Sequence, residues 1–222
     1  KEYRRQRQMC IRDRYYGGDK NIVNEKVKKG FDIFMGKGNC SSCHAVGEKS
    51  ALFFDNKLHN TGIGYAESMG LLKNKKTRVQ LAPGEYVEVD NNIIKSVNQQ
   101  KRKNDLGLYT ITENPSHRWL FKTAGLRNIS LTAPYMHNGI FATLDEVIDF
   151  YNEGGFQNEL LSPMIRKLNL SSLEKENLKL FLESLVGENI NILIADAISV
   201  PVGDLTKDDP NWANDTDMGY NK

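Results

Sequence analysis

Cysteine is scarce in this chain, with three among 222 residues, too few for a disulfide framework. No apolar run approaches the roughly 20 residues that a membrane-spanning helix needs, so no transmembrane segment is predicted. Neither sign of charge dominates, because 30 Lys and Arg stand against 28 Asp and Glu and the two are interspersed. This balance gives no argument for a nucleic-acid partner.

The chain also lacks a starting Met and the apolar core of a signal peptide, since it opens KEYRRQRQMCIRDRYYGG. The run RRQRQMCIRDR has no hydrophobic period of 2 or 3.6 and resembles translated adapter sequence. We therefore expect residues 1–20 to be a non-native segment, Cys10 included, or else a basic linker. Because the natural start is expected to be missing, the absent signal gives no information on the compartment.

Residues 21–35 are expected to form an amphipathic helix. Apolar side chains recur at helical spacing at Val23, Val27, Phe31 and Phe34. A glycine-containing segment, 36–38, then ends the helix directly before two of the three cysteines.

Two capping boxes predict further helices, one opened by Thr143 with Glu146 and the other by Ser171 with Glu174. The first helix is expected to bury the face that carries Leu144, Val147, Ile148 and Tyr151, and to expose Asp145, Glu146, Asp149 and Asn152. The second is expected to bury Leu178, Phe181, Leu182 and Leu185.

The rest of the chain carries weak secondary-structure signals. Residues 45–105 are rich in Gly, Asn and Asp, which favours long loops, with a short hairpin expected near 80–89. The polar tail from Val200 is expected to be extended or disordered. We therefore expect one domain over 21–187 and a C-terminal extension over 188–222.

Cys40, Cys43 and His44 form a C-x-x-C-H motif, for which three interpretations compete. A structural zinc site needs four ligands, and the other candidates are Cys10 and scattered histidines. A thioredoxin-like pair would open a helix after a strand, whereas here a helix precedes the motif. Covalent c-type haem attachment uses both thiols and the adjacent His as an iron ligand. The helix before the motif and the apolar helix near the end of the chain favour haem.

The segment FKTAGLRNISLTAPYMHNGIFATLDEVIDFYNEGG, residues 121–155, resembles the C-terminal haem domain of the bacterial di-haem cytochrome c peroxidase and MauG family. The segments ALFFDNKLHNTGIG and DLGLYTITENP resemble its connecting segments. The resemblance implies a periplasmic protein with two c-type haems, the peroxide-reacting one in an N-terminal domain that this chain does not include. It also implies calcium at the interface of the two domains.

The resemblance assigns roles to individual residues. It implies Tyr151 as the distal iron ligand, as in MauG-like members, with Met136 as the alternative. Arg127 is expected near the haem propionates, and His137 is expected to form structural hydrogen bonds near the haem. Thr132 and the Pro134 carbonyl correspond to part of the calcium site.

Four further aromatic residues receive only structural expectations. We expect Trp119 and Phe121 in the core beside the haem. His59 and His117 are expected in surface or turn positions and are assigned no role.

These features predict a mainly α, cytochrome-c-like domain with long loops around one covalently bound haem. The function implied is electron transfer within a peroxidase that reduces hydrogen peroxide, or drives an oxidation with it, using electrons from a small donor such as a cytochrome. A homodimer is compatible with this interpretation. The alternative is a mono-haem cytochrome that serves only as an electron carrier.

Overall fold

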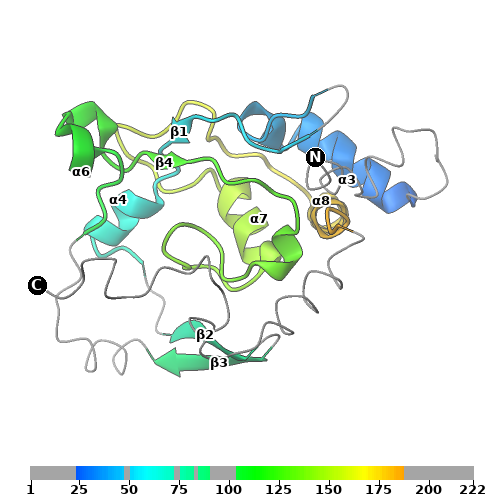
Figure 1. Ribbon diagram of the computed structural model, residues 1–222. Helices are drawn as coiled ribbons and strands as arrows, with labels where there is room; N and C mark the ends of the chain where they lie inside the picture. The colour runs from blue at the N-terminus through cyan, green and yellow to red at the C-terminus, as the bar shows by residue number, and fades with distance from the viewer. Residues whose placement is uncertain (1–23, 48–50, 73–75, 83–84, 91–103, 188–222) are drawn as a thin grey trace, which may run out of the picture. The chain divides into compact units, whose positions relative to one another are not determined.

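The computed structural model describes residues 24–47, 51–72, 76–82, 85–90 and 104–187 (Figure 1). The chain divides into two compact units, residues 1–187 and residues 188–222, and every described residue belongs to the first. The expected 1–20 segment and the tail from Val200 lie outside the described residues. No helix among the described residues is long and apolar enough to cross a membrane.

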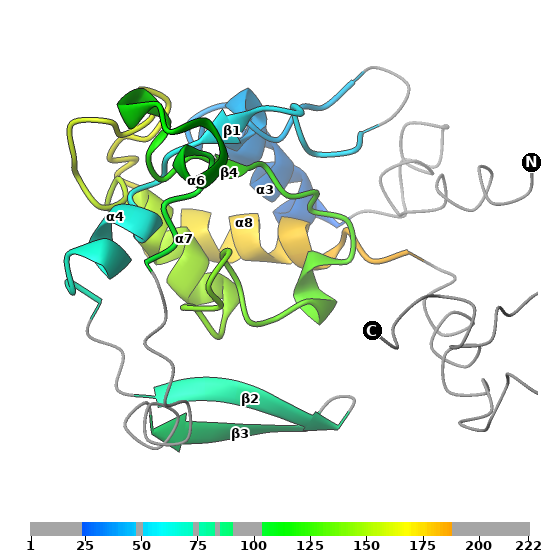
Figure 2. The same cartoon turned by 60° about the vertical axis from the view of Figure 1, so that its left-hand side comes forward.

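Three helices form the framework, α3 (Glu25–Met35), α7 (Leu144–Asn152) and α8 (Ser172–Glu183). Helix α8 packs against both of the others (Figures 1 and 2). Of the expected helix 21–35, residues 21–23 lie outside the described part, and Asn24 caps α3 by accepting a hydrogen bond from the Val27 N–H. Both predicted capping boxes are present, at the starts of α7 and α8.

A close backbone approach between α3 and α8 depends on Gly30. A Cβ atom placed on Gly30 would lie 2.0 Å from the Asn177 carbonyl oxygen, which is inside van der Waals contact. Beside this crossing, Phe34 and Phe181 pack with ring centroids 5.2 Å apart, and both side chains are buried. The crossing thus fixes the end of α3, from which the C-x-x-C-H motif continues.

Irregular structure connects these helices, as expected, and two short antiparallel pairs interrupt it. Strand β2 (Lys76–Ala82) pairs with β3 (Glu85–Asp90), which confirms the predicted hairpin and extends it at both ends. Strand β1 (Leu58–His59) pairs with β4 (Phe121–Lys122) and so joins loops distant in sequence.

Short helical turns account for most of the remaining regular structure. They are the α-helices α4 (Ile63–Ser68) and α6 (Tyr109–Thr112) and the 3₁₀ turns η2 (Cys40–Ser42), η3 (Pro115–His117) and η4 (Ile129–Leu131). Helix α4 was not predicted, and the expectation of loops there was wrong. Its N-cap, Gly62, offers no side-chain cap, so the six-residue helix has no start signal in the sequence.

Candidate functional site: a haem-binding cavity

The C-x-x-C-H residues lie on one tight turn directly after α3. The Gly38 N–H donates to the Ile33 carbonyl (2.7 Å), which folds the chain back at the helix end. The 3₁₀ turn η2 begins at Cys40, and the His44 N–H donates to the Cys40 carbonyl (2.9 Å). Both thiols and the imidazole are therefore presented from a single turn.

This turn forms one wall of a cavity of about 440 Å³, within the range of small-molecule sites in proteins. Cys40, Cys43 and His44 line it on one side. Much of the remaining lining is apolar and comes from α7, α8 and the segment between them: Leu144, Val147, Ile148, Leu168, Leu170, Leu178 and Leu182. An apolar cavity beside two thiols and an imidazole has the chemistry that a covalently bound haem needs.

His44 is held in one tautomer. Its Nδ1 donates to the Phe53 carbonyl at 2.7 Å, so the ligand nitrogen would be Nε2. Burial lowers the pKa of His44, against the opposing effect of the Phe53 carbonyl. A neutral imidazole with Nδ1–H committed to a carbonyl is the form in which His binds a metal.

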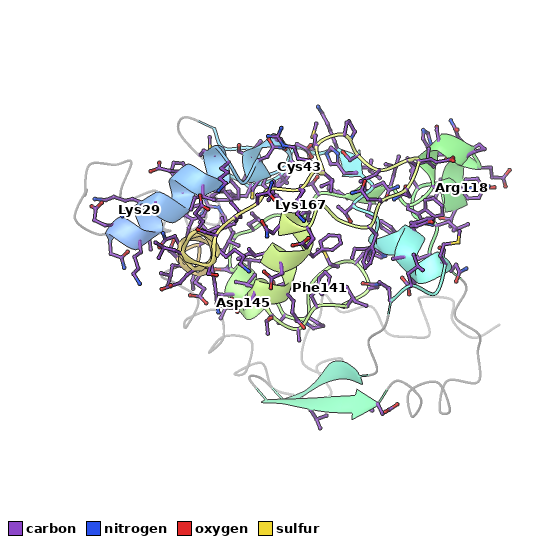
Figure 3. The ribbon with its side chains drawn as sticks, turned by 180° about the vertical axis from the view of Figure 1, so that it is seen from behind. Lys29, Cys43, Arg118, Phe141, Asp145 and Lys167 are labelled. Atoms are coloured by element: carbon purple, nitrogen blue, oxygen red, sulfur yellow. The ribbon has the colours of Figure 1, made fainter. Side chains whose placement is uncertain are left out.

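The two cysteines are unpaired thiols. Burial raises the pKa of Cys40 to about 12, and burial also raises the pKa of Cys43. The Cys43 thiol donates to Met164 Sδ at 3.5 Å, and Figure 3 shows Cys43 beside the segment that carries Lys167. Raised thiol pKa values disfavour a thioredoxin-like pair, whose nucleophilic Cys needs a lowered pKa.

Tyr151 and Met136 both line the cavity, so both candidates for the distal ligand reach it. Tyr151 lies on α7 with Val147 and Ile148, as the helical register predicted. Burial raises the pKa of Tyr151 above its usual value, so the phenol stays protonated until a cation lies beside it. Met136 lies in a turn, and its own φ is +69°.

His137, Thr132 and Pro134 also line the cavity. The His137 ring stacks on Phe121, with centroids 3.6 Å apart and planes 13° from parallel, and its Nε2 lies 3.8 Å from a Glu67 carboxylate oxygen. Thr132 and Pro134 supply at most a hydroxyl and a carbonyl of the six to eight oxygens that calcium takes. These two residues alone do not fit a calcium site.

Arg127 and Trp119 lie elsewhere. Arg127 is absent from the described residues that line the cavity, and its Nε donates to the Ala51 carbonyl at 3.0 Å. Trp119 is buried as expected but does not contribute to the described cavity lining. Its ring packs on Tyr65 at 5.2 Å, and its Nε1–H donates to Ser68 Oγ at 3.0 Å. Phe121 does line the cavity.

Two expectations about polar residues were wrong. His59 is no surface residue: its side chain is 12% exposed, lines the cavity and bonds Asp55 through Nε2 at 2.8 Å. Asn152 is buried rather than exposed on α7, because its Oδ1 accepts from the Leu170 N–H (2.7 Å) and fixes the chain entering α8. Composition gives no signal for either residue, since polar groups become buried only through such specific partners.

Sequence reasoning also missed a cluster beside the motif. Ligand-type atoms of Cys43, Asp55 and His59 all lie within 4.8 Å of one another. The Asp-x-x-x-His spacing of DNKLH was the available signal. Thioether formation would use the Cys43 sulfur, so with haem attached the cluster reduces to the Asp55–His59 pair.

Comparison with known proteins shows to which proteins this chain is related in sequence. The cytochrome-c peroxidase IdrP2 of Denitromonas iodatirespirans is 40% identical over 181 residues, which are 82% of this chain and 45% of that protein. This chain is a homologue of the di-haem cytochrome c peroxidases and MauG proteins. The methylamine utilization protein MauG of Methylorubrum extorquens is 27% identical over 79% of this chain and 39% of its own. No family model matches.

Solved structures agree with the sequence relatives. A MauG-like protein associated with microbial copper homeostasis superposes with a TM-score of 0.59 at 28% identity, over 82% of this chain and 53% of its own. The diheme peroxidase BthA of Burkholderia thailandensis superposes with a TM-score of 0.55 at 20% identity, over 81% of this chain and 46% of BthA. The mainly α, cytochrome-type fold is confirmed. The chain spans less than half the length of the curated relatives it matches.

Proposed function

We propose that this chain is the electron-transfer haem domain of a di-haem cytochrome c peroxidase, corresponding to the C-terminal of the two haem domains. One observation carries the proposal. Cys40, Cys43 and His44, in C-x-x-C-H order, line an apolar cavity together with Tyr151, and His44 has its Nδ1 committed to a carbonyl. In this role the intact protein works in the periplasm.

Each residue has a defined task in this role. Cys40 and Cys43 would hold the haem through thioether bonds, and His44 would ligate the iron through Nε2. Tyr151 would supply the second protein ligand, with Met136 as the alternative. When bound, the haem supplies a one-electron centre that exchanges electrons with a small donor protein, such as a cytochrome, and with a second haem of the intact protein.

The residues around the cavity would tune the reduction potential of a bound haem. The apolar side chains of α7 and α8 exclude water from the cavity, which favours the less charged ferrous state and so raises the reduction potential. An anionic phenolate from Tyr151 would oppose this effect and favour the ferric state. Arg127 near the propionates and a calcium completed by another domain remain proposals that need groups beyond those described.

The electron-transfer role makes two kinetic predictions. A reduced small c-type cytochrome should reduce the ferric chain in a stopped-flow experiment. Steady-state peroxide turnover with the same donor should be a small fraction of that of IdrP2, because a haem ligated by both His44 and Tyr151 has no open position for peroxide.

The outcomes separate the candidate functions. Turnover comparable to that of IdrP2 would contradict the assignment to electron transfer. A coding sequence upstream of this chain that carries a signal peptide and no second C-x-x-C-H motif would instead support the mono-haem carrier.

A further inference from the structure

The loop that faces His44 contains one residue, Phe53, in a backbone conformation that its bulky side chain disfavours. Phe53, whose carbonyl accepts from His44 Nδ1–H, has a φ of +56°, and Asn56 has a φ of +60°. A bulky residue with positive φ is strained and persists only where its surroundings hold it. The Phe53 ring is fully buried, 5.9 Å from the Phe34 ring centroid, which holds one end of the loop.

Asp55 holds the other end. One carboxylate oxygen accepts from the Lys57 N–H at 2.9 Å, and the other accepts from His59 Nε2 at 2.8 Å. The Asp55 and His59 side chains are 10% and 12% exposed. Burial would raise the pKa of Asp55, but hydrogen bonds from His59, Lys57 and Thr123 outweigh it and lower the pKa to about 2. Asp55 is therefore an ionised acceptor.

These bonds connect the loop to regular structure. His59 belongs to β1 and pairs with Phe121 of β4, and the Thr123 N–H donates to the Lys57 carbonyl at 3.1 Å. His59 and Phe121 both line the cavity. Through its hydrogen bond with His59, Asp55 thus connects the loop after Phe53 to the β1–β4 pair at the cavity wall.

We propose that Asp55, acting with His59, is a positioning residue for the haem ligand His44. It holds the loop 53–59 in the conformation in which the Phe53 carbonyl accepts from Nδ1–H. That hydrogen bond raises the basicity of the ligating nitrogen and so stabilises ferric iron, which lowers the reduction potential. This role rests on the proposed haem function.

A competing explanation is that the carboxylate acts by its charge alone. An anion beside the haem would also stabilise ferric iron, without any effect on the loop. Asp55→Asn and Asp55→Ala separate the two. Asn removes the charge but keeps an oxygen for the Lys57 N–H, whereas Ala removes both.

The test is the midpoint potential of the haem-loaded protein, measured by redox titration for the wild type and both variants. Asp55→Ala should shift the ferric–ferrous equilibrium toward ferrous at least about 10-fold further than Asp55→Asn, or about 59 mV for one electron. Proton NMR of the ferric protein should show faster solvent exchange of His44 Nδ1–H in Asp55→Ala only. Equal potentials in the two variants, or no shift in either, would overturn the positioning role.

Asp105 supplies the matched control. Its Oδ1 accepts from the Gly107 N–H at 2.9 Å, so Asp105 bonds the N–H two residues later, just as Asp55 bonds the Lys57 N–H. Asp105 does not line the described cavity. Asp105→Ala should leave the exchange of His44 Nδ1–H unchanged. An equal effect from Asp105→Ala would count against a specific role for Asp55.

A second pair covers the case in which Asp55→Ala gives no haem-loaded protein. His59→Gln keeps an amide donor for Asp55, and His59→Ala does not. The midpoint potential of the haem should rise further in His59→Ala than in His59→Gln. Equal potentials in these two variants would overturn the proposal. A wild-type chain that matures without covalent haem would instead overturn the proposed function itself, and this role with it.

Discussion

At the residue scale, His44 shows what a motif does and does not specify. The C-x-x-C-H spacing, together with the helix before it, favours Cys40, Cys43 and His44 as a haem-attachment set. The partner of His44 Nδ1 is the Phe53 carbonyl, and no sequence pattern could name it. A backbone carbonyl carries no side-chain signature, and its position depends on the positive φ of Phe53, which only tertiary packing maintains.

The two polar residues whose exposure was predicted wrongly, His59 and Asn152, also depend on partners that no sequence pattern could name. Asn152 was expected to be exposed because it lies on the polar face of the predicted helix, and His59 was expected in a surface or turn position. Each is enclosed because one partner distant along the chain or across a turn satisfies it, Asp55 for His59 and the Leu170 N–H for Asn152. Helical register predicted that Tyr151 faces the cavity, whereas specific partners determine the burial of these two residues.

The identity of the distal ligand is also a residue-scale prediction. In the haem-loaded chain, Tyr151→Phe should change the optical and EPR spectra of the ferric haem and raise its reduction potential, because a hard anionic oxygen stabilises ferric iron. Met136→Leu is the matched control and should leave the spectra unchanged, although Met136 lines the same cavity. Spectral change in Met136→Leu alone would assign Met136 as the ligand.

At the element scale, local signals predicted the helices that carry their own caps. Thr143 with Glu146 and Ser171 with Glu174 form both bonds of a capping box, as expected. No comparable signal marks α4, whose cap is a glycine, or the β1–β4 pair, which is two residues long on each side. Such short elements are stabilised by the surfaces they pack on, which a sequence pattern does not reveal.

Glu174 makes the start of α8 sensitive to pH. Hydrogen bonds from Lys37 and from the Ser171 N–H and side chain lower its pKa to about 2, and Lys37 lies 2.7 Å away in the segment after α3. The pKa in the unfolded chain is about 4.3. The resulting stabilisation is therefore complete above that value and is lost as the pH falls toward 2.

Glu174→Gln should keep the capping bonds but lose this charge effect. The wild type should unfold at higher denaturant concentration than the variant at neutral pH, and the difference should disappear near pH 2. Glu176→Gln is the matched control, because Glu176 pairs with Lys26 of α3 but is half exposed. A difference between wild type and Glu174→Gln that is the same at all pH values would contradict the assignment.

At the scale of the whole molecule, the described domain corresponds to less than half of each curated relative that it matches. Its cavity presents one C-x-x-C-H set, enough to attach one haem, whereas the proposed peroxide chemistry depends on a second haem elsewhere in the intact protein. The predicted relation to the family is confirmed at the level of the chain by relatives that match about four-fifths of it. The assignment to one of the two haem domains remains a proposal.

Covalent haem attachment is the central claim, and it has a direct measurement. The chain should be expressed with a c-type maturation system and denatured, and its intact mass should then be determined. We predict a mass increase equal to one haem in the wild type, carried by the peptide that contains Cys40 and Cys43. The matched variant Cys10→Ser should retain the haem, and Cys40→Ser with Cys43→Ser should lose it. A correctly expressed wild-type chain without added mass would contradict the account.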